Sequence, residues 1–141
     1  PGISSSISVP GLAGIPVTHR GVSESFWVIT GTTKENVISG DVFSAAKINA
    51  TVVILMGLSK LNEIVEVFKN EGKTELPVAI IQNGSLPSQK IVVGTIQTIV
   101  NEVKEKNISA PAVIVIGEVV KQHDLFKEYI LQSGNIFNEG K

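Results

Sequence analysis

The chain has 141 residues, 43% of them apolar, and its 12 Lys and Arg nearly balance its 13 Asp and Glu. One domain of this length buries enough apolar surface to fold without a disulfide, and the chain contains no cysteine to form one. A net charge of −1, and apolar runs far shorter than the about 20 residues that span a bilayer, argue against a nucleic-acid or membrane partner.

Five short segments rich in Val, Ile and aromatic residues predict β-strands. They are residues 26–30, 51–56, 78–82, 90–93 and 112–116. Most of them are apolar almost throughout, which is typical of strands buried on both faces of a sheet.

Apolar residues at helical spacing predict three helices. They cover residues 61–68, 96–103 and 120–130. Ser59 and Thr95 are the expected N-caps of the first two, and Gly72 is the expected end of the first. The serines at 4–6 resemble a helix cap more than a linker, and the tail after Ser133 is expected to fray.

Strands that alternate with helices predict an α/β fold. The strands at 51–56 and 78–82, with the helix between them, would form one right-handed βαβ unit and run parallel. The link at 83–89 is too short for a crossover helix, so the next strand should return antiparallel. We therefore expect a mixed sheet of about five strands with flanking helices.

Four of the predicted strands are followed by a glycine. These glycines are Gly31, Gly57, Gly84 and Gly117. In open α/β sheets, ligands bind beyond the carboxyl ends of the strands, so the four glycines could form one rim that a ligand approaches. The alternative is that glycines simply end strands, and both interpretations stay open at this point.

Side chains suited to catalysis are sparse. With His19 and His123 as the only histidines and no cysteine, neither a metal site nor a Ser-His-Asp triad can be assembled. Arg20 is the only arginine, and it follows Thr18 and His19. A guanidinium binds carboxylates through two parallel hydrogen bonds, so Arg20 is either a ligand-binding residue or an ordinary surface cation.

Several motifs in series resemble the C-terminal half of the uroporphyrinogen-III C-methyltransferases, a tetrapyrrole methyltransferase family. They are PGISS at 1–5, GIPVTHRG at 14–21, VILMG at 53–57, PVAIIQNG at 77–84 and GEVV at 117–120. The resemblance runs from Pro1 to about Lys127. It implies that residues 1–132 are the C-terminal domain of a two-domain enzyme and residues 133–141 a tail. The N-terminal domain is then missing, and we expect a fragment that is inactive alone.

The family resemblance also implies an activity. Its members transfer methyl groups from S-adenosyl-L-methionine to C2 and C7 of uroporphyrinogen III, giving precorrin-2 for sirohaem and cobalamin synthesis and releasing S-adenosyl-L-homocysteine. They are cytoplasmic and typically homodimers. The alternatives are a non-catalytic ligand-binding or dimerisation domain and a related precorrin methyltransferase.

Site residues follow from the same resemblance, by matching motifs. It places Ser4, Ser5, Met56 and Gly84 against the cofactor, and Arg20 with His19 near the tetrapyrrole. Catalytic residues are expected in the missing N-terminal domain, and no metal is expected. Thr32 stands where the family has a histidine, which removes an imidazole from the expected pocket.

Overall fold

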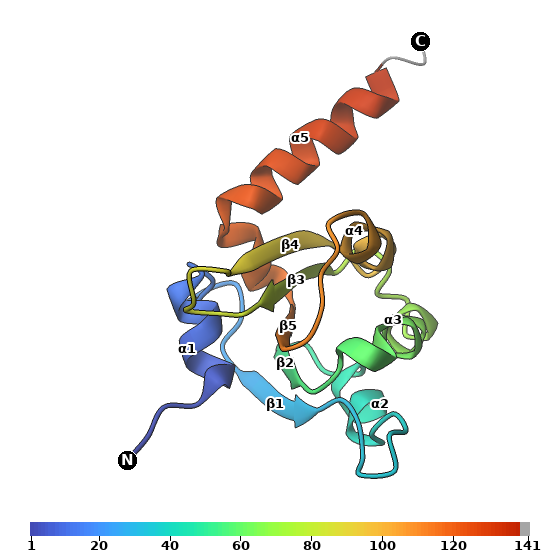
Figure 1. Ribbon diagram of the computed structural model, residues 1–141. Helices are drawn as coiled ribbons and strands as arrows, with labels where there is room; N and C mark the ends of the chain where they lie inside the picture. The colour runs from blue at the N-terminus through green and yellow to red at the C-terminus, as the bar shows by residue number, and fades with distance from the viewer. Residues whose placement is uncertain (139–141) are drawn as a thin grey trace.

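One five-stranded sheet organises the protein (Figure 1). The computed structural model describes residues 1–138, the last four of them by backbone alone. The strands are β1 (Phe26–Thr30), β2 (Thr51–Leu55), β3 (Pro77–Gln82), β4 (Lys90–Thr95) and β5 (Ala112–Ile116). Their order in the sheet is β1-β2-β5-β3-β4. The predicted α/β fold with five strands is confirmed.

The sheet is mixed, as predicted. β1 and β2 are parallel, whereas β5 is antiparallel to both of its neighbours, β2 and β3, and β4 is antiparallel to β3. β2 and β3 therefore run in the same direction, as the βαβ interpretation required. They are not hydrogen-bonded to each other, because β5 lies between them.

Three helices pack on one face of the sheet: α2 (Asp41–Ala45), α3 (Leu61–Asn70) and α4 (Ile99–Glu105). The amphipathic spacing of α3 directs Ile64 and Phe68 into the core that it forms with this face.

The ends of α3 agree only in part with the sequence analysis. Gly72 ends the helix as predicted, with φ +74°, and the Lys73 N–H donates to Phe68 O. Ser59 is not the N-cap, because the chain enters the helix through a 3₁₀ turn at Leu58–Lys60 that makes Lys60 the cap.

The opposite face is covered by α1 (Ser5–Leu12), a 3₁₀ turn η2 (Glu118–Gln122) and the start of α5 (Asp124–Asn138). Ser4 caps α1, as the serine-rich start suggested, and its Oγ accepts the Ser6 N–H. Val53, Ala79 and Val115 of the central strands complete this second core.

Three further helix boundaries differ from the predictions. The third predicted helix begins at Asp124 rather than at residue 120, because the chain first forms the 3₁₀ turn η2. β4 continues to Thr95, which pairs with Pro77, so α4 begins three residues later than expected and Thr95 is not its cap. α5 stays helical through Asn138 and projects away from the sheet (Figure 1), so the frayed tail predicted after Ser133 is wrong up to that residue. Residues 139–141 lie outside the described part of the chain.

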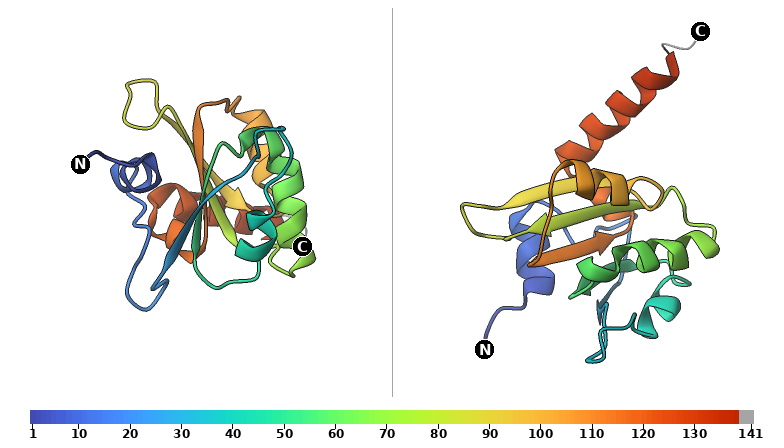
Figure 2. Two further views of the ribbon diagram at one scale, coloured as in Figure 1. Left: turned by 90° about the horizontal axis from the view of Figure 1, so that it is seen from below. Right: turned by 45° about the vertical axis from the view of Figure 1, so that its right-hand side comes forward.

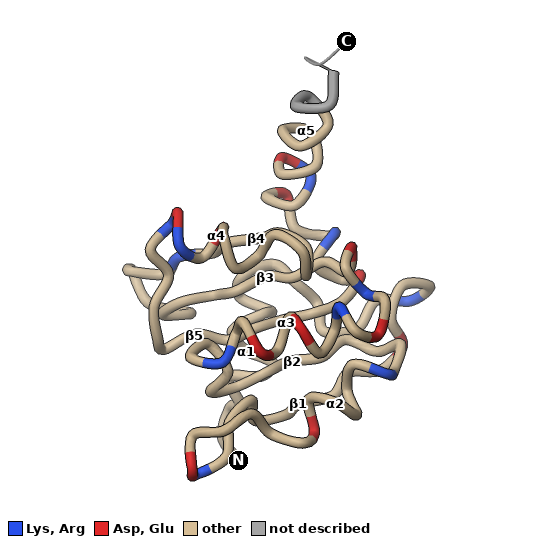
Figure 3. The backbone as a smooth tube through the Cα atoms, turned by 90° about the vertical axis from the view of Figure 1, so that its right-hand side faces the viewer, with Lys and Arg blue, Asp and Glu red and all other residues tan. Residues whose placement is uncertain are grey.

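Charges of both signs are mixed over the molecule, except that residues 1–19, which include α1, carry no Lys, Arg, Asp or Glu. Figure 3 shows Lys and Arg interspersed with Asp and Glu along the loops and helices. Within residues 1–138, no helix has both the length and the apolarity that crossing a membrane would require.

Candidate functional site

The carboxyl ends of β1, β2 and β3 lie together at one end of the sheet, called the carboxyl edge below. Gly31, Gly57 and Gly84 follow them there. Gly117 lies at the opposite edge, because β5 runs the other way. A Cβ on Gly117 would lie 3.3 Å from the Cα of Thr51, the first residue of β2. A single rim of four glycines, one of the two interpretations that the sequence left open, is therefore wrong, and three glycines share this end of the strands.

These three glycines pack closely against the protein itself. A Cβ on Gly31 would come 2.6 Å from Gly57 Cα, and one on Gly84 would come 2.5 Å from Val9 Cγ1 in α1. Both distances are shorter than carbon atoms tolerate. Internal packing alone accounts for glycine at positions 31 and 84.

Met56 occupies this carboxyl edge, directly after β2. Its backbone has φ +51°, its side chain is 67% exposed, and the Thr32 Oγ1 donates a 3.0 Å hydrogen bond to its carbonyl oxygen. The two residues line a hollow of about 340 Å³. The other residues that line it are Leu58, Ser59, Ala110, Pro111 and Ala112. The sequence placed Met56 at this edge, and the fold brings Thr32 to it from 24 residues away.

Ser4 and Ser5 are exposed at the start of α1. The Ser4 Oγ lies 2.6 Å from the Ser6 Oγ, in addition to its capping bond, so the serine turn is ordered by its own hydroxyls. The same helix contacts Gly84 through Val9, and both views in Figure 2 place it beside the β3–β4 turn. α1 thus links the serine turn to the edge that carries Gly84.

His19 and Arg20 lie at the opposite end of the strands, where β2 begins. His19 forms an isolated bridge with Ser23, and the Ser23 Oγ accepts the N–H of Thr51 at 3.1 Å. The turn is therefore anchored where β2 begins, whereas Met56 follows its end. A five-residue strand spans about 16 Å, so the structure separates Arg20 and His19 from Met56 and Gly84.

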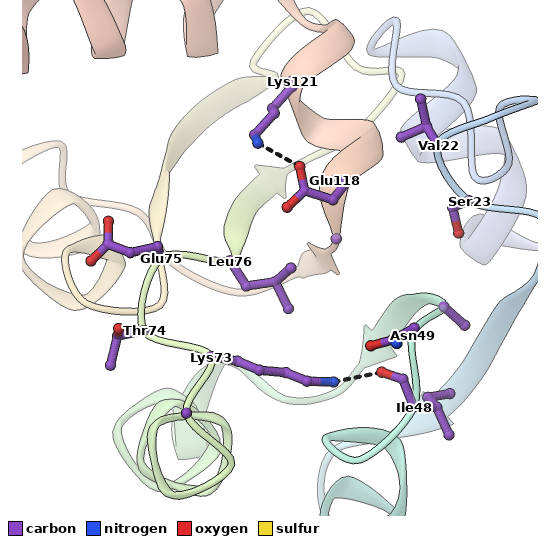
Figure 4. Close-up of a pocket in the computed structure, with 13 residues that line it drawn as sticks. Val22, Ser23, Ile48, Asn49, Lys73, Thr74, Glu75, Leu76, Glu118 and Lys121 are labelled. Carbon is purple, nitrogen blue, oxygen red and sulfur yellow. Dashed lines mark hydrogen bonds and ion pairs between the residues drawn. The ribbon is translucent and has the colours of Figure 1, made fainter.

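A second hollow, of about 440 Å³, lies at the edge where β2 and β3 begin (Figure 4). Lys73 crosses it and donates from Nζ to Ile48 O at 2.6 Å, and Lys121 pairs with Glu118. The sequence analysis missed this hollow, because loops far apart in the chain form it. Its lysines already bind partners within the protein.

The sequence profile of one family, the Tetrapyrrole (Corrin/Porphyrin) Methylases, matches residues 1–100. The chain belongs to this family. Its mixed five-stranded sheet, with helices on both faces, is therefore a tetrapyrrole methylase domain.

Two relatives and one solved structure extend the match. The chain is 46% identical over 127 residues to a uroporphyrinogen-III C-methyltransferase of Methanocaldococcus jannaschii, covering 88% of the chain and 52% of the relative. It is 37% identical over 130 residues to a siroheme synthase of Thiobacillus denitrificans, covering 92% and 27%. A uroporphyrin-III C-methyl transferase of Thermus thermophilus, complexed with S-adenosylhomocysteine, superposes with a TM-score of 0.69 at 26% identity, covering 86% and 52%.

The chain spans about half the length of the Methanocaldococcus jannaschii tetrapyrrole methylase. Its similarity therefore concerns one half of such an enzyme. None of the matches tests the individual residues Ser4, Ser5, Met56, Gly84, Arg20 and His19, whose roles stay predictions.

Proposed function

We propose that residues 1–132 form the C-terminal domain of an S-adenosyl-L-methionine-dependent uroporphyrinogen-III C-methyltransferase, which methylates C2 and C7 to give precorrin-2. The observation that carries this proposal is the 46% identity, over 88% of the chain, to an enzyme of that name. Catalytic acid–base residues would then lie in the other half of the enzyme.

The carboxyl edge of the sheet supplies this domain's wall of the cofactor cleft. The cofactor brings the sulfonium methyl group that is transferred. Met56 offers an exposed, polarisable thioether beside it, and the hydrogen bond from Thr32 fixes the backbone of Met56. The backbone at Gly84 and the turn at Ser4 and Ser5 offer uncharged hydrogen-bonding groups, which suit an adenine edge and a ribose.

Arg20 and His19 bind the substrate in this proposal. Arg20 is exposed, and a guanidinium fork matches the carboxylates at the periphery of uroporphyrinogen. Arg20 lies at the start of β2, whereas Met56 follows its end. In this proposal Arg20 therefore holds a peripheral group of the substrate and not the carbon that receives the methyl. Methyl transfer depends on such positioning, because the two reacting centres must be aligned before the bond forms.

Assembly and pathway form part of the same proposal. We place the enzyme in the cytoplasm as a homodimer that supplies precorrin-2 for sirohaem synthesis, with cobalamin as a second destination. The similarity to a siroheme synthase supports the first pathway.

A hybrid enzyme tests the activity. The chain is joined to the N-terminal half of the Methanocaldococcus jannaschii relative, and formation of precorrin-2 is followed by absorbance and mass spectrometry. We expect turnover that requires both halves and S-adenosyl-L-methionine. Met56→Ala should weaken cofactor binding, whereas Leu86→Ala, at another exposed apolar residue, should not. A folded hybrid that binds the cofactor but never methylates uroporphyrinogen III would contradict the proposal.

A stand-alone binding domain is the competing function, since the chain carries a hollow at Met56 without an evident catalytic group. Isothermal titration of the 141-residue chain with S-adenosyl-L-homocysteine separates the two. A shared cleft predicts weak binding by one wall, so micromolar affinity of the chain alone would favour the binding domain.

A further inference from the structure

β1 is an edge strand whose outer side is unpaired in the described residues. It pairs only with β2. On the side that faces β2, Ser25 O accepts the N–H of Thr51, and the Gly31 N–H donates to Leu55 O. Because successive residues of a strand point their backbone groups to opposite sides, Phe26, Val28 and Thr30 direct theirs outward. No other backbone hydrogen bond of residues 1–138 reaches these three.

This edge lacks the features that usually protect an exposed strand. Its sequence, FWVIT, contains no charge and no proline. Trp27 is 43% exposed beside Val52 on the α3 face, and Val28 is 44% exposed beside Val53 on the α1 face. Helices contact both edge strands, α4 and α5 on β4 and α2 on β1. Trp27 and Val28 stay exposed all the same, so the β1 edge is apolar and accessible.

We propose that the β1 strands of two copies pair antiparallel across a two-fold axis at Val28, which joins the two sheets into one. In this register Val28 exchanges both backbone hydrogen bonds with Val28 of the second copy, and Phe26 exchanges both with Thr30 of the second copy. All three outward residues of each strand are then paired. This inference rests on the proposed homodimer and assigns its interface.

Side chains agree with the same register. Val28 faces Val28 of the second copy on the α1 face, and Trp27 faces Ile29 of the second copy on the α3 face. Apolar and aromatic pairs of this kind stabilise antiparallel strands, and no like charges meet. A second copy satisfies this edge because the strand is complementary to itself.

Cysteine cross-linking tests the register directly, because the chain has no cysteine of its own. In the proposed pairing the two Val28 residues form a hydrogen-bonded pair with Cα and Cβ atoms about 5.5 Å apart, which is too far for a direct disulfide and suits a short bifunctional thiol reagent. A short bis-methanethiosulfonate should therefore join Val28→Cys rapidly into a covalent dimer. The matched control is Leu86→Cys, 54% exposed in the β3–β4 turn. Cross-linking of Val28→Cys no faster than that of the control would overturn the register.

Val28→Pro tests the hydrogen bonds. Proline removes the outward N–H of residue 28 and leaves the ladder to β2 intact, whereas Val28→Thr keeps both the N–H and the β-branch. Sedimentation velocity should show a rise in the dimer dissociation constant of at least about tenfold for the proline variant and little change for the threonine variant. If the proline variant does not fold, the cross-linking result decides.

A monomeric wild-type chain at its highest soluble concentration would also overturn the inference. Assembly is measured without cofactor or substrate. An inactive hybrid enzyme therefore leaves the interface standing, and a monomeric chain leaves the methyltransferase proposal standing.

Discussion

Gly84 and Val9 fix the position of α1 on the sheet. A methyl group at residue 84 would overlap Val9, which is buried, so the helix would have to move. We expect Gly84→Ala to lower the free energy of unfolding by about 1–3 kcal/mol in urea denaturation. Val9→Ala in the same chain should restore part of this loss, because it removes the colliding atoms.

Gly11→Ala is the control for that pair. It also adds a methyl group to α1, but Gly11 has open space around its Cβ position. Alanine is the better helix former, so we expect a gain of about 0.5–1 kcal/mol. A similar loss in both variants would show that the contact with Val9 is not the cause.

The motif resemblance predicts a histidine at the position of Thr32, and Thr32 lines the hollow beside Met56. We expect Thr32→His to fold with an unfolding free energy within about 1.5 kcal/mol of the parent, since only one neutral hydrogen bond is exchanged. Thermal melting followed by circular dichroism checks this. Gross unfolding would mean that position 32 is packed rather than open to the hollow.

Arg20 is expected to act on activity and not on stability. In the hybrid enzyme, Arg20→Ala should lower kcat/KM for uroporphyrinogen III about ten- to hundredfold, the cost of losing a charged hydrogen-bond donor. Its melting temperature should not change, because Arg20 is exposed. Lys34→Ala, at another exposed cation, is the control. Unchanged turnover in Arg20→Ala would remove the role assigned to that residue.

Among the connections between elements, the hydrogen bond from Lys73 joins the loop after α3 to the loop before β2. Lys73→Met keeps most of the side chain and removes the ammonium. We expect it to lower the unfolding free energy by about 1–3 kcal/mol, because the carbonyl of Ile48 loses a charged donor. Lys69→Met removes only an exposed ion pair with Glu66 and should cost less than about 1 kcal/mol. Equal losses in the two variants would contradict this role of Lys73.

The positions of the strands were predictable, whereas the direction of β5 was not. Runs of β-branched residues are local signals, and all five predicted strands are present. The direction of β5 follows from its place between β2 and β3, which no local pattern records. Because β5 is antiparallel to β2 and β3, Gly117 lies at the opposite end of the strands from Gly31, Gly57 and Gly84.

The candidate site was predictable to the same extent. Met56 and Gly84 follow strands that run the same way, so the sequence could place them at one edge. Arg20 could not be placed, because its turn is held by the hydrogen bond between Ser23 and Thr51, residues 28 apart in the chain. Thr32 became part of the site only through its bond to Met56.

At the scale of the whole molecule, the two hydrophobic cores share the same strands. Ile54 belongs to one core and Val53 to the other, and both come from β2. We expect one cooperative unfolding transition, in which Trp27 fluorescence and circular dichroism at 222 nm give coincident curves. Separate midpoints would show that the two faces unfold independently.

The position of β5 has a consequence for biosynthesis. It is the last strand of the sheet in chain order, yet it lies between β2 and β3. A nascent polypeptide on the ribosome therefore holds these two strands apart, with unpaired and apolar borders, until residue 116 has left the exit tunnel. Folding of this domain is tied to the emergence of β5, and chaperones have most to protect just before that point.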